Sequence, residues 1–318
     1  MAFDVSSLTS YVIENEDQLM AKSLFGSKTS DLIRSQGNLL VGVKSSQKIN
    51  LLDTDAIFQS GTGCTRTSSG TTTITQRTVT VGDIAVVEDV CVNSLNTKYL
   101  SKSLAAGSDP NKIPFEQEFT DLKAATISKQ LEIAIWQGDT SHGNANLSKF
   151  DGFVKLIDNA ATAVNGNPTG ITTSTGITSA NVVSIVNGVV AKIPADVLGK
   201  EDVAVFCGWD TFMLYVQAYT ALNLFAFAPS GNEVKAEAGE IIIPGTYYKL
   251  TAVHGLDGTN RIFAMRTSNM FGGTDLSGEE DKWSLMEDQF KDYLRFKAHF
   301  KYGVNVAFPN EVVSFKLV

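Results

Sequence analysis

The chain has few charged residues, and those it has are more often acidic than basic. Asp, Glu, Lys and Arg make up 19% of its 318 residues, with 26 basic and 34 acidic side chains and a formal net charge of −8. Soluble domains contain about 25% charged residues, and proteins that grip nucleic acid use Lys and Arg against the phosphates. The composition therefore argues against tight binding of DNA or RNA over the whole surface, although an acidic wall can face nucleic acid without adhering to it.

Cysteine and long apolar runs are scarce as well. Cys64, Cys91 and Cys207 are too few and too widely spaced for a disulfide framework or a zinc site, so we expect free thiols in a reducing cytosol during synthesis. No stretch reaches the ~18–20 apolar residues that a membrane-spanning helix needs. The start, MAFDVSSLTSYVIENEDQ, has neither a basic n-region nor an apolar h-region, so we expect no signal peptide.

The sequence also lacks the motifs that carry catalysis, metal binding or phosphate binding. Its three histidines, His142, His254 and His299, form no HExxH pattern, and no GxSxG is present. Residues 26–30 (GSKTS) lack the Gly–Lys pair of a phosphate-binding loop, and the acidic stretch 278–283 is typical of a solvated loop. We therefore predict no catalytic residue, no metal and no cofactor.

What the sequence does contain is a long, polar β-hairpin between Lys48 and Val92. Its arms, 48–59 and 71–92, flank a small polar tip with the sequence SGTGCTRTSSG. An isolated two-stranded hairpin is marginal in water, and the Thr, Gln and Arg near this tip cannot bury both of its faces within one chain. We expect the hairpin to lie against another copy of the same chain, which favours assembly over catalysis.

Two further long elements are expected. The stretch 114–137 has apolar residues at helical spacing and acidic residues near its start, which predicts a helix of roughly 36 Å. The stretch 292–306 alternates with a period of two, which predicts a long, half-buried strand. The basic face of this strand consists of Arg295, Lys297, His299 and Lys301. This face is either ordinary solvated surface or a partner for acidic residues of a neighbouring subunit, such as Glu116, Glu118 and Asp121.

The remaining segments predict an amphipathic arm and a mixed α+β lobe. Residues 1–36 form an arm that needs a partner surface, because an isolated helix of this size is marginal. A short strand is expected over 150–158, ahead of the lobe. The lobe is expected to contain a helix over 178–193 capped by Ser179, a buried strand at 203–207 and a helix capped by Asp210. The C-terminal third alternates short strands with turns and ends in a strand.

The order of these elements resembles that of the major capsid proteins of tailed bacteriophages, which have the Hong Kong 97-type fold. Three stretches are similar to the branch of this family from phages of Bacteroidetes: NLLDTDAIFQSGTGCTRTSSGTTTITQRTVTVGDI, LEIAIWQGD and PADVLGKEDVAVFCGWDTF. They begin at Asn50, Leu131 and Pro194. The similarity of arrangement covers essentially the whole chain.

The resemblance implies an α+β fold of the Hong Kong 97 type, with six parts along the chain. These are an N-terminal arm (1–36), an extended β-ribbon or E-loop (37–98), a peripheral domain with a spine helix (99–156), a mixed α/β axial domain (157–279), the long strand of the peripheral domain (280–302) and a final strand returning to the axial domain (303–318).

The resemblance further implies a structural protein that is made in the host cytoplasm and forms pentamers and hexamers of an icosahedral virion shell around double-stranded DNA. Expected partners are copies of itself, with portal, scaffolding and decoration proteins, and DNA held without sequence-specific contacts. Candidate contacts between subunits are Thr62, Gly63, Cys64, Arg66, Arg77, Glu116, Glu118, Asp121, Arg295, Lys297, His299 and Lys301. Two alternatives stay open: an encapsulin-type shell that holds protein cargo, and a non-catalytic β-rich binding protein.

Overall fold

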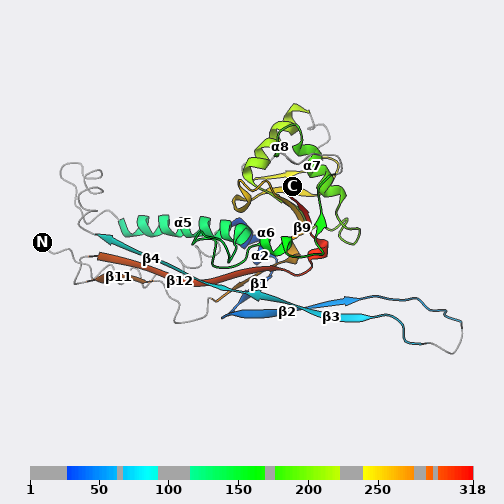
Figure 1. Cartoon of the computed structure of the whole chain (residues 1–318), viewed down its shortest axis with the longest axis horizontal. Helices are drawn as coiled ribbons and strands as arrows, with labels where there is room; N and C mark the ends of the chain where they lie inside the picture. Colours follow the sequence, from blue (N-terminus) through cyan, green and yellow to red (C-terminus); the bar gives the residue numbers. More distant parts are fainter. Residues whose placement is uncertain are drawn as a thin grey trace.

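A flat body, an upright lobe and a projecting β-ribbon make up the molecule (Figure 1). In this computed structural model the described residues are 27–62, 67–91, 115–168, 176–222, 239–275, 284–288 and 293–317. The arm expected before residue 27 and the acidic loop 278–283 lie outside them.

The body contains a sheet built around one long strand. β12 (Tyr293–Val306) pairs antiparallel with β10 (Met270–Thr274) near its end, with β11 (Ser284–Asp288) near its start, and with β4 (Gly82–Cys91) along its other edge. β1 (Leu39–Val41) extends the sheet by pairing parallel with β10. β12 is thus the strand on which the body is assembled.

The predicted alternation along β12 is confirmed. Its apolar face is buried, whereas Arg295 and Lys297 on the opposite face are exposed. The buried side chains are Phe296, Ala298, Phe300 and Tyr302. Ile84 and Val86 of β4 pack against the same core, because they lie on the same face of the sheet.

Three helices contribute side chains to the core that covers this sheet. They are α5 (Phe115–Gln137), α6 (Phe153–Asp158) and α2 (Lys28–Ser35). The long helix α5 is confirmed. The strand predicted within 150–158 is wrong, because this segment forms α6. Phe153 and Ile157 are both buried on one side of α6, where they stand about one helical turn apart.

A second sheet lies in the upright lobe. Its order is β5-β13-β9-β6-β8-β7, and β6 pairs parallel with β8 and antiparallel with β9. The strands are β5 (Val164–Asn165), β6 (Val203–Cys207), β7 (Glu240–Ile242), β8 (Lys249–Ala252), β9 (Ile262–Arg266) and β13 (Val313–Phe315). Short 3₁₀ helices occur at η5 (His254–Leu256), η6 (Thr267–Asn269) and η7 (Pro309–Glu311). The final strand of the chain therefore lies in this sheet.

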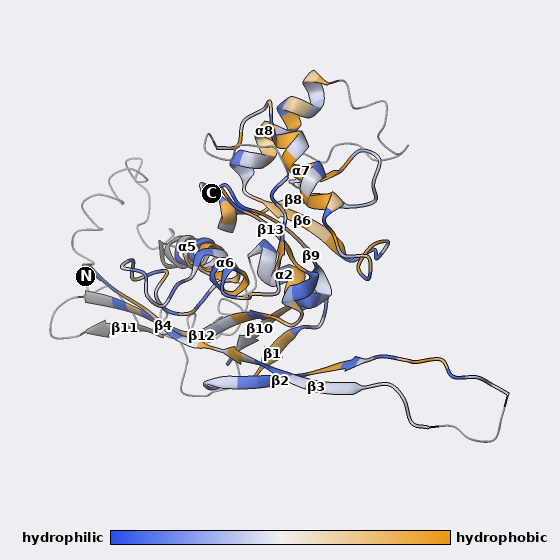
Figure 2. Ribbon diagram, turned by 45° about the vertical axis from the view of Figure 1, so that its right-hand side comes forward, coloured by the Kyte–Doolittle hydropathy of each residue, from blue (hydrophilic) through white to orange (hydrophobic). Residues whose placement is uncertain are grey.

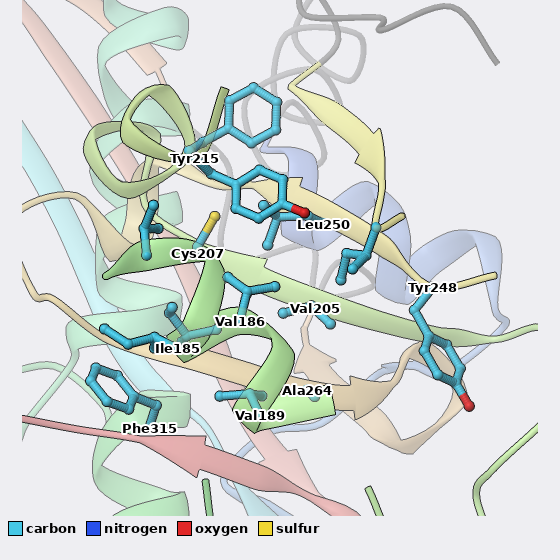
Figure 3. Packing of buried hydrophobic residues seen from close by; sticks show 14 of the residues in the cluster. Ile185, Val186, Val189, Val205, Cys207, Tyr215, Tyr248, Leu250, Ala264 and Phe315 are labelled. Atoms are coloured by element: carbon cyan, nitrogen blue, oxygen red, sulfur yellow. The ribbon is translucent and has the colours of Figure 1, made fainter. Parts of the chain in front are cut away.

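Helices α7 (Val182–Ala191) and α8 (Trp209–Ala221) bury their apolar sides against the second sheet (Figure 3). Both predicted N-caps are wrong by two residues. Asn181 and Gly208 occupy the cap positions instead of Ser179 and Asp210. The Asp210 carboxylate accepts hydrogen bonds from the backbone N–H groups of Thr211 and Gly258, so it ties the first turn of α8 to a loop rather than capping the helix.

The projecting ribbon consists of β2 (Ser46–Thr54) and β3 (Thr72–Thr80), paired antiparallel along their whole length. The expectation that the second arm pairs with the first up to Val92 is wrong, because the chain leaves the ribbon at Val81 and continues as β4 in the first sheet. Close packing at two glycines permits this crossing. A Cβ on Gly82 would lie 1.9 Å from the Lys149 carbonyl oxygen, and one on Gly303 would lie 2.1 Å from that of Thr80.

Trp136, near the end of α5, packs between the body and the upright lobe. It is fully buried, and its ring lies 5.3 Å from Phe153 of α6, 5.4 Å from Phe206 of β6 and 5.8 Å from Phe263 of β9. Aromatic pairs at such distances add stabilisation beyond the area they bury. The spine helix therefore contacts the second sheet as well as the first.

A buried hydrogen-bond chain attaches α2 to the same place. The Trp136 Nε1–H donates to Thr29 Oγ1 (2.8 Å), and the Thr29 hydroxyl and backbone N–H donate to the two carboxylate oxygens of Glu132 (2.5 and 3.1 Å). Ser30 Oγ lies 3.1 Å from the hydroxyl of Tyr302 on β12. Desolvation by burial raises the pKa of Glu132, against the hydrogen bonds from Thr29 and Ser27. The stretch GSKTS therefore anchors a helix to a buried acid.

We expect Thr29→Val to destabilise the protein by about 2–3 kcal/mol, because the change leaves Trp136 Nε1 and one oxygen of Glu132 buried without their partner. Urea unfolding followed by tryptophan fluorescence measures the loss. Thr73→Val, on the exposed ribbon, serves as control and should stay within about 0.5 kcal/mol of wild type. Equal stability of the two variants would show that the hydrogen-bond chain does not hold α2.

Candidate subunit interface

The ribbon is mostly polar in sequence, but it exposes several apolar side chains. Leu52 and Ile74 face each other across β2 and β3, and they are 63% and 71% exposed. On the opposite face Leu51 and Val79 are buried near the ribbon base. The sequence identified the ribbon as a surface in need of a partner, but it did not single out this pair.

Two larger apolar side chains lie beyond the end of β2. Ile57 is 58% exposed and Phe58 is 99% exposed, and this part of the ribbon is coloured as hydrophobic in Figure 2. The Gln59 amide bonds to Thr67 O and Ser69 Oγ, so the neighbouring polar residues fold onto each other. Burying an exposed Phe side chain contributes about 1.5–3 kcal/mol. Among the described ribbon residues, Phe58 therefore offers the largest free energy of burial to a partner.

The structure places the predicted ribbon contacts in different settings. Thr62 is exposed and bonds to Ser60, and Arg77 is half-buried on β3 opposite Ile49. Gly63, Cys64 and Arg66 lie outside the described residues. The described ribbon residues thus supply a polar surface around the exposed apolar pair and Phe58.

The basic face of β12 is partly paired within the chain. Arg295 forms a two-bond ion pair with Asp89 of β4 (Nε–Oδ1 2.7 Å, Nη2–Oδ2 2.8 Å). Lys301 lies 3.4 Å from Asp83 and donates to the carbonyl oxygen of Lys44 (2.8 Å). Lys297 is exposed and His299 half-buried between these two pairs. An exposed ion pair of this kind contributes at most about 1 kcal/mol.

The acidic residues proposed to meet this face lie on the first turns of α5. For Glu116, Glu118 and Asp121 the structure describes the helix but not the side chains. α5 packs on the buried face of the sheet, opposite the basic face. Pairing between these acidic residues and the basic face of β12 in a neighbouring chain stays a prediction.

Other chemistry is sparse over the part of the chain that the structure describes. There, no three His, Cys, Asp or Glu side chains gather as metal ligands do. The Cys207 thiol is fully buried, and burial raises its pKa, so the thiolate needed for nucleophilic attack is suppressed. No described helix is long and apolar enough to span a membrane.

No family model and no curated protein matches the chain, but solved structures do. A chain in the procapsid of satellite phage P4 with its size determination protein aligns with a TM-score of 0.59 at 12% identity, covering 98% of this chain and 96% of that one. The cyanophage A-1(L) capsid gives 0.57 at 8% identity, covering 89% and 90%. The capsid of the Myoviridae phage XM1 gives 0.56 at 14%, covering 90% and 92%.

Identities this low establish the fold alone. The chain has the α+β fold of tailed-phage capsid proteins, the Hong Kong 97-type fold predicted from its sequence. The likeness extends over nearly the full length of each chain, so the body, the lobe and the ribbon are all parts of that fold.

A charge swap separates the role of Arg295 within the chain from a role between chains. Arg295→Glu combined with Asp89→Arg restores the ion pair, so we expect wild-type stability. We also expect weaker assembly, most evident at low ionic strength, because the swap exchanges the positions of a positive and a negative charge that face the partner, and salt screens the resulting mismatch. Sedimentation velocity at two salt concentrations measures both. Wild-type assembly of the swapped protein at each salt concentration would leave this face as ordinary surface.

Proposed function

We propose that the protein is a major capsid protein, a structural subunit that assembles into pentamers and hexamers of an icosahedral shell around double-stranded DNA. The observation that carries this is the match of nearly the whole chain to phage capsid chains. The ribbon supports it independently, because it leaves the body and presents Leu52, Ile74 and Phe58 to solvent. Such a surface gains stability only when a partner covers it.

The two cores support a division into a peripheral domain, around the first sheet and α5, and an axial domain, around the second sheet with α7 and α8. In this proposal residues 1–36 form the N-terminal arm. The segment 303–318 completes β12 of the first sheet up to Val306 and then returns to the axial domain with β13. β1 and β4 belong to the peripheral sheet, so the E-loop within 37–98 is the β2–β3 ribbon, lying over an adjacent subunit.

The proposed role is structural rather than enzymatic, in a virion whose subunits are synthesised in the host cytoplasm. Its main partner is another copy of the chain, since closed symmetric shells offer the same partner surface to each subunit. Portal, scaffolding and decoration proteins complete the proposed set. The net charge of −8 suits a wall that encloses DNA without gripping it.

Negative-stain electron microscopy after size-exclusion chromatography tests this role. Closed shells, tubes, or rings of five and six subunits support it, and a monomer at each salt and protein concentration counts against self-assembly. Particles that enclose a folded protein in place of DNA would favour the encapsulin-type alternative.

Shortening the ribbon should abolish closed shells without unfolding the subunit. Thr54 and Thr72 are the last paired residues, so an Asn–Gly turn in place of residues 55–71 closes a two-residue hairpin. We expect an unchanged circular dichroism spectrum and thermal midpoint, because these residues contribute to neither core, together with loss of shells in the microscope.

Tyr247→Ser is the control for loss of exposed apolar surface, since Tyr247 is 92% exposed on the other lobe. It should assemble normally. Unfolding of the shortened protein would mean that the ribbon supports its own subunit, and normal shells would mean that the tip makes no contact needed for assembly.

A further inference from the structure

The upright lobe meets the body where two neighbouring strands pass from one sheet to the other (Figure 1). β9 of the second sheet continues through η6 into β10 of the first, and β12 of the first continues through η7 into β13 of the second. β9 pairs with β13, and β10 pairs with β12, both antiparallel. The two sheets thus share one two-stranded ladder, which is interrupted between them at residues 265–269 and 307–312, here called the joint.

The side chain of Asn269 bridges the joint. Its Nδ2–H donates to the carbonyl oxygen of Phe308 (2.8 Å), and its Oδ1 accepts from the backbone N–H of Phe308 (2.7 Å). The Asn269 carbonyl oxygen also accepts from the backbone N–H of Ala307 (3.1 Å). A side chain that donates to and accepts from one residue reproduces the two hydrogen bonds of an antiparallel strand pair. Asn269 therefore acts in place of a backbone pair across the joint.

Asn269 is held in position from the body side and is only 2% exposed. The Nδ2–H of Asn38 donates to the carbonyl oxygen of Ser268 (2.8 Å), and the Asn38 carbonyl oxygen accepts from the backbone N–H of Gly272 (3.1 Å). Because Asn269 is buried, water cannot readily replace a bond that it loses. An aliphatic side chain there would leave both peptide groups of Phe308 without this partner.

Ion pairs near the joint hold its direction less well. Arg266 Nε lies 3.0 Å from Asp202 Oδ2, but both residues belong to the second sheet or its approach. The pair that reaches into η7 is longer, at 3.5 Å between Arg266 Nη1 and Glu311 Oε2. These side chains keep a fifth to a quarter of their exposure (24% and 19%), so salt screens the pair.

The packing of Trp136 on Phe263 also links the two parts of the molecule. Apolar packing is not directional, so it sets how closely the parts approach but leaves them free to roll. Hydrogen bonds weaken when their angles change. The buried amide of Asn269 is therefore the group at the joint that opposes rotation.

We infer that Asn269 is the positioning residue that fixes the angle between the upright lobe and the body. While its side chain is bonded to Phe308, the β9–β13 and β10–β12 pairs keep one course and the two sheets move as a unit. This angle is a property of one subunit, so it can be measured whether or not shells form.

Asn269→Asp tests the two-way bonding with a side chain of nearly the same shape. As a carboxylate it accepts from the Phe308 N–H but has no proton for the Phe308 carbonyl oxygen. Burial and that carbonyl oxygen both raise the pKa of the new carboxyl. Its stabilising bond is thus present at low pH and is lost as the pH rises through the raised pKa.

Pulsed electron paramagnetic resonance between two spin labels reports the angle as a distance. The background carries Cys64→Ser and Cys91→Ser, and Cys207 is retained because it is fully buried. The labels are attached at Val87→Cys on β4 and Tyr247→Cys on the lobe, since these positions are 56% and 92% exposed. Labelled subunits are diluted with unlabelled ones, so that each distance lies within one subunit.

For Asn269→Asp we expect a broader distance distribution than wild type at about pH 8, and a return to the wild-type width at about pH 5. Asn269→Ala should be broad at both pH values, because it cannot recover the bond. Wild type at the same pH values controls for the other titrating groups, Arg266, Asp202 and Glu311 included.

Asn305→Asp is the matched control. Asn305 also bonds in both directions, since its Nδ2–H donates to the carbonyl oxygen of Thr78 (2.7 Å) and its Oδ1 accepts from the backbone N–H of Val306 (2.7 Å). These bonds join β12 to the ribbon and do not cross the joint. We expect the wild-type distribution from this variant at both pH values.

A wild-type width for Asn269→Ala and for Asn269→Asp at about pH 8 would overturn the inference. Equal broadening of Asn269→Asp at both pH values would overturn it too, because the loss would then not depend on the donated bond. A wild-type distance that changes in about 1 M salt would assign the angle to the Arg266–Glu311 ion pair instead.

Discussion

The position of Trp136 is the constraint on which the arrangement of the two lobes depends. Its ring packs on aromatic residues of α6 and of two strands of the second sheet, while its Nε1–H is held by Thr29. Gly255 lies so close that a Cβ there would meet the ring at 2.2 Å. One side chain at the end of the spine helix therefore sets the distance to the second sheet and the docking site of α2. The Glu132 carboxylate one turn earlier makes that docking specific, since burial leaves it Thr29 and few other partners.

Anchored in this way, the body can carry a ribbon that has no core of its own. β3 leads directly into β4, and β4 pairs with β12 over ten residues, from Gly82 to Cys91. The ribbon is thus a continuation of a strand that is itself held in the sheet. Isolated hairpins are marginal, but here the base is fixed by Val79, which is fully buried against the body. β3 is therefore fixed to the body at Val79, while its other end lies in solvent.

Sequence periodicity predicted the elements whose burial is one-sided. β12 alternates because one face meets α5, and α5 shows a helical pattern because one side meets the sheet. The short segments were harder. Phe153 and Ile157 fit a strand or one helical turn equally well until the fold-back at Gly138 and Gly152 decides. The burial of Glu132 could not be predicted from its neighbours in the sequence, because its partner Thr29 is 103 residues away. Similarly, nothing local shows that Phe58 stays exposed, or that β4 leaves the ribbon for β12.

The same strand path also sets the direction in which the ribbon leaves the body. β3 continues through Val81 into β4, so the course of the ribbon follows from the pairing of β4 with β12. The ribbon and the sheet cross at Gly82 and Gly303, whose missing side chains let the backbones approach closely. A ring of subunits closes only at a particular rotation between neighbours. In the proposed shell, the angle at which the ribbon crosses the sheet at these glycines therefore contributes to the rotation between neighbouring subunits.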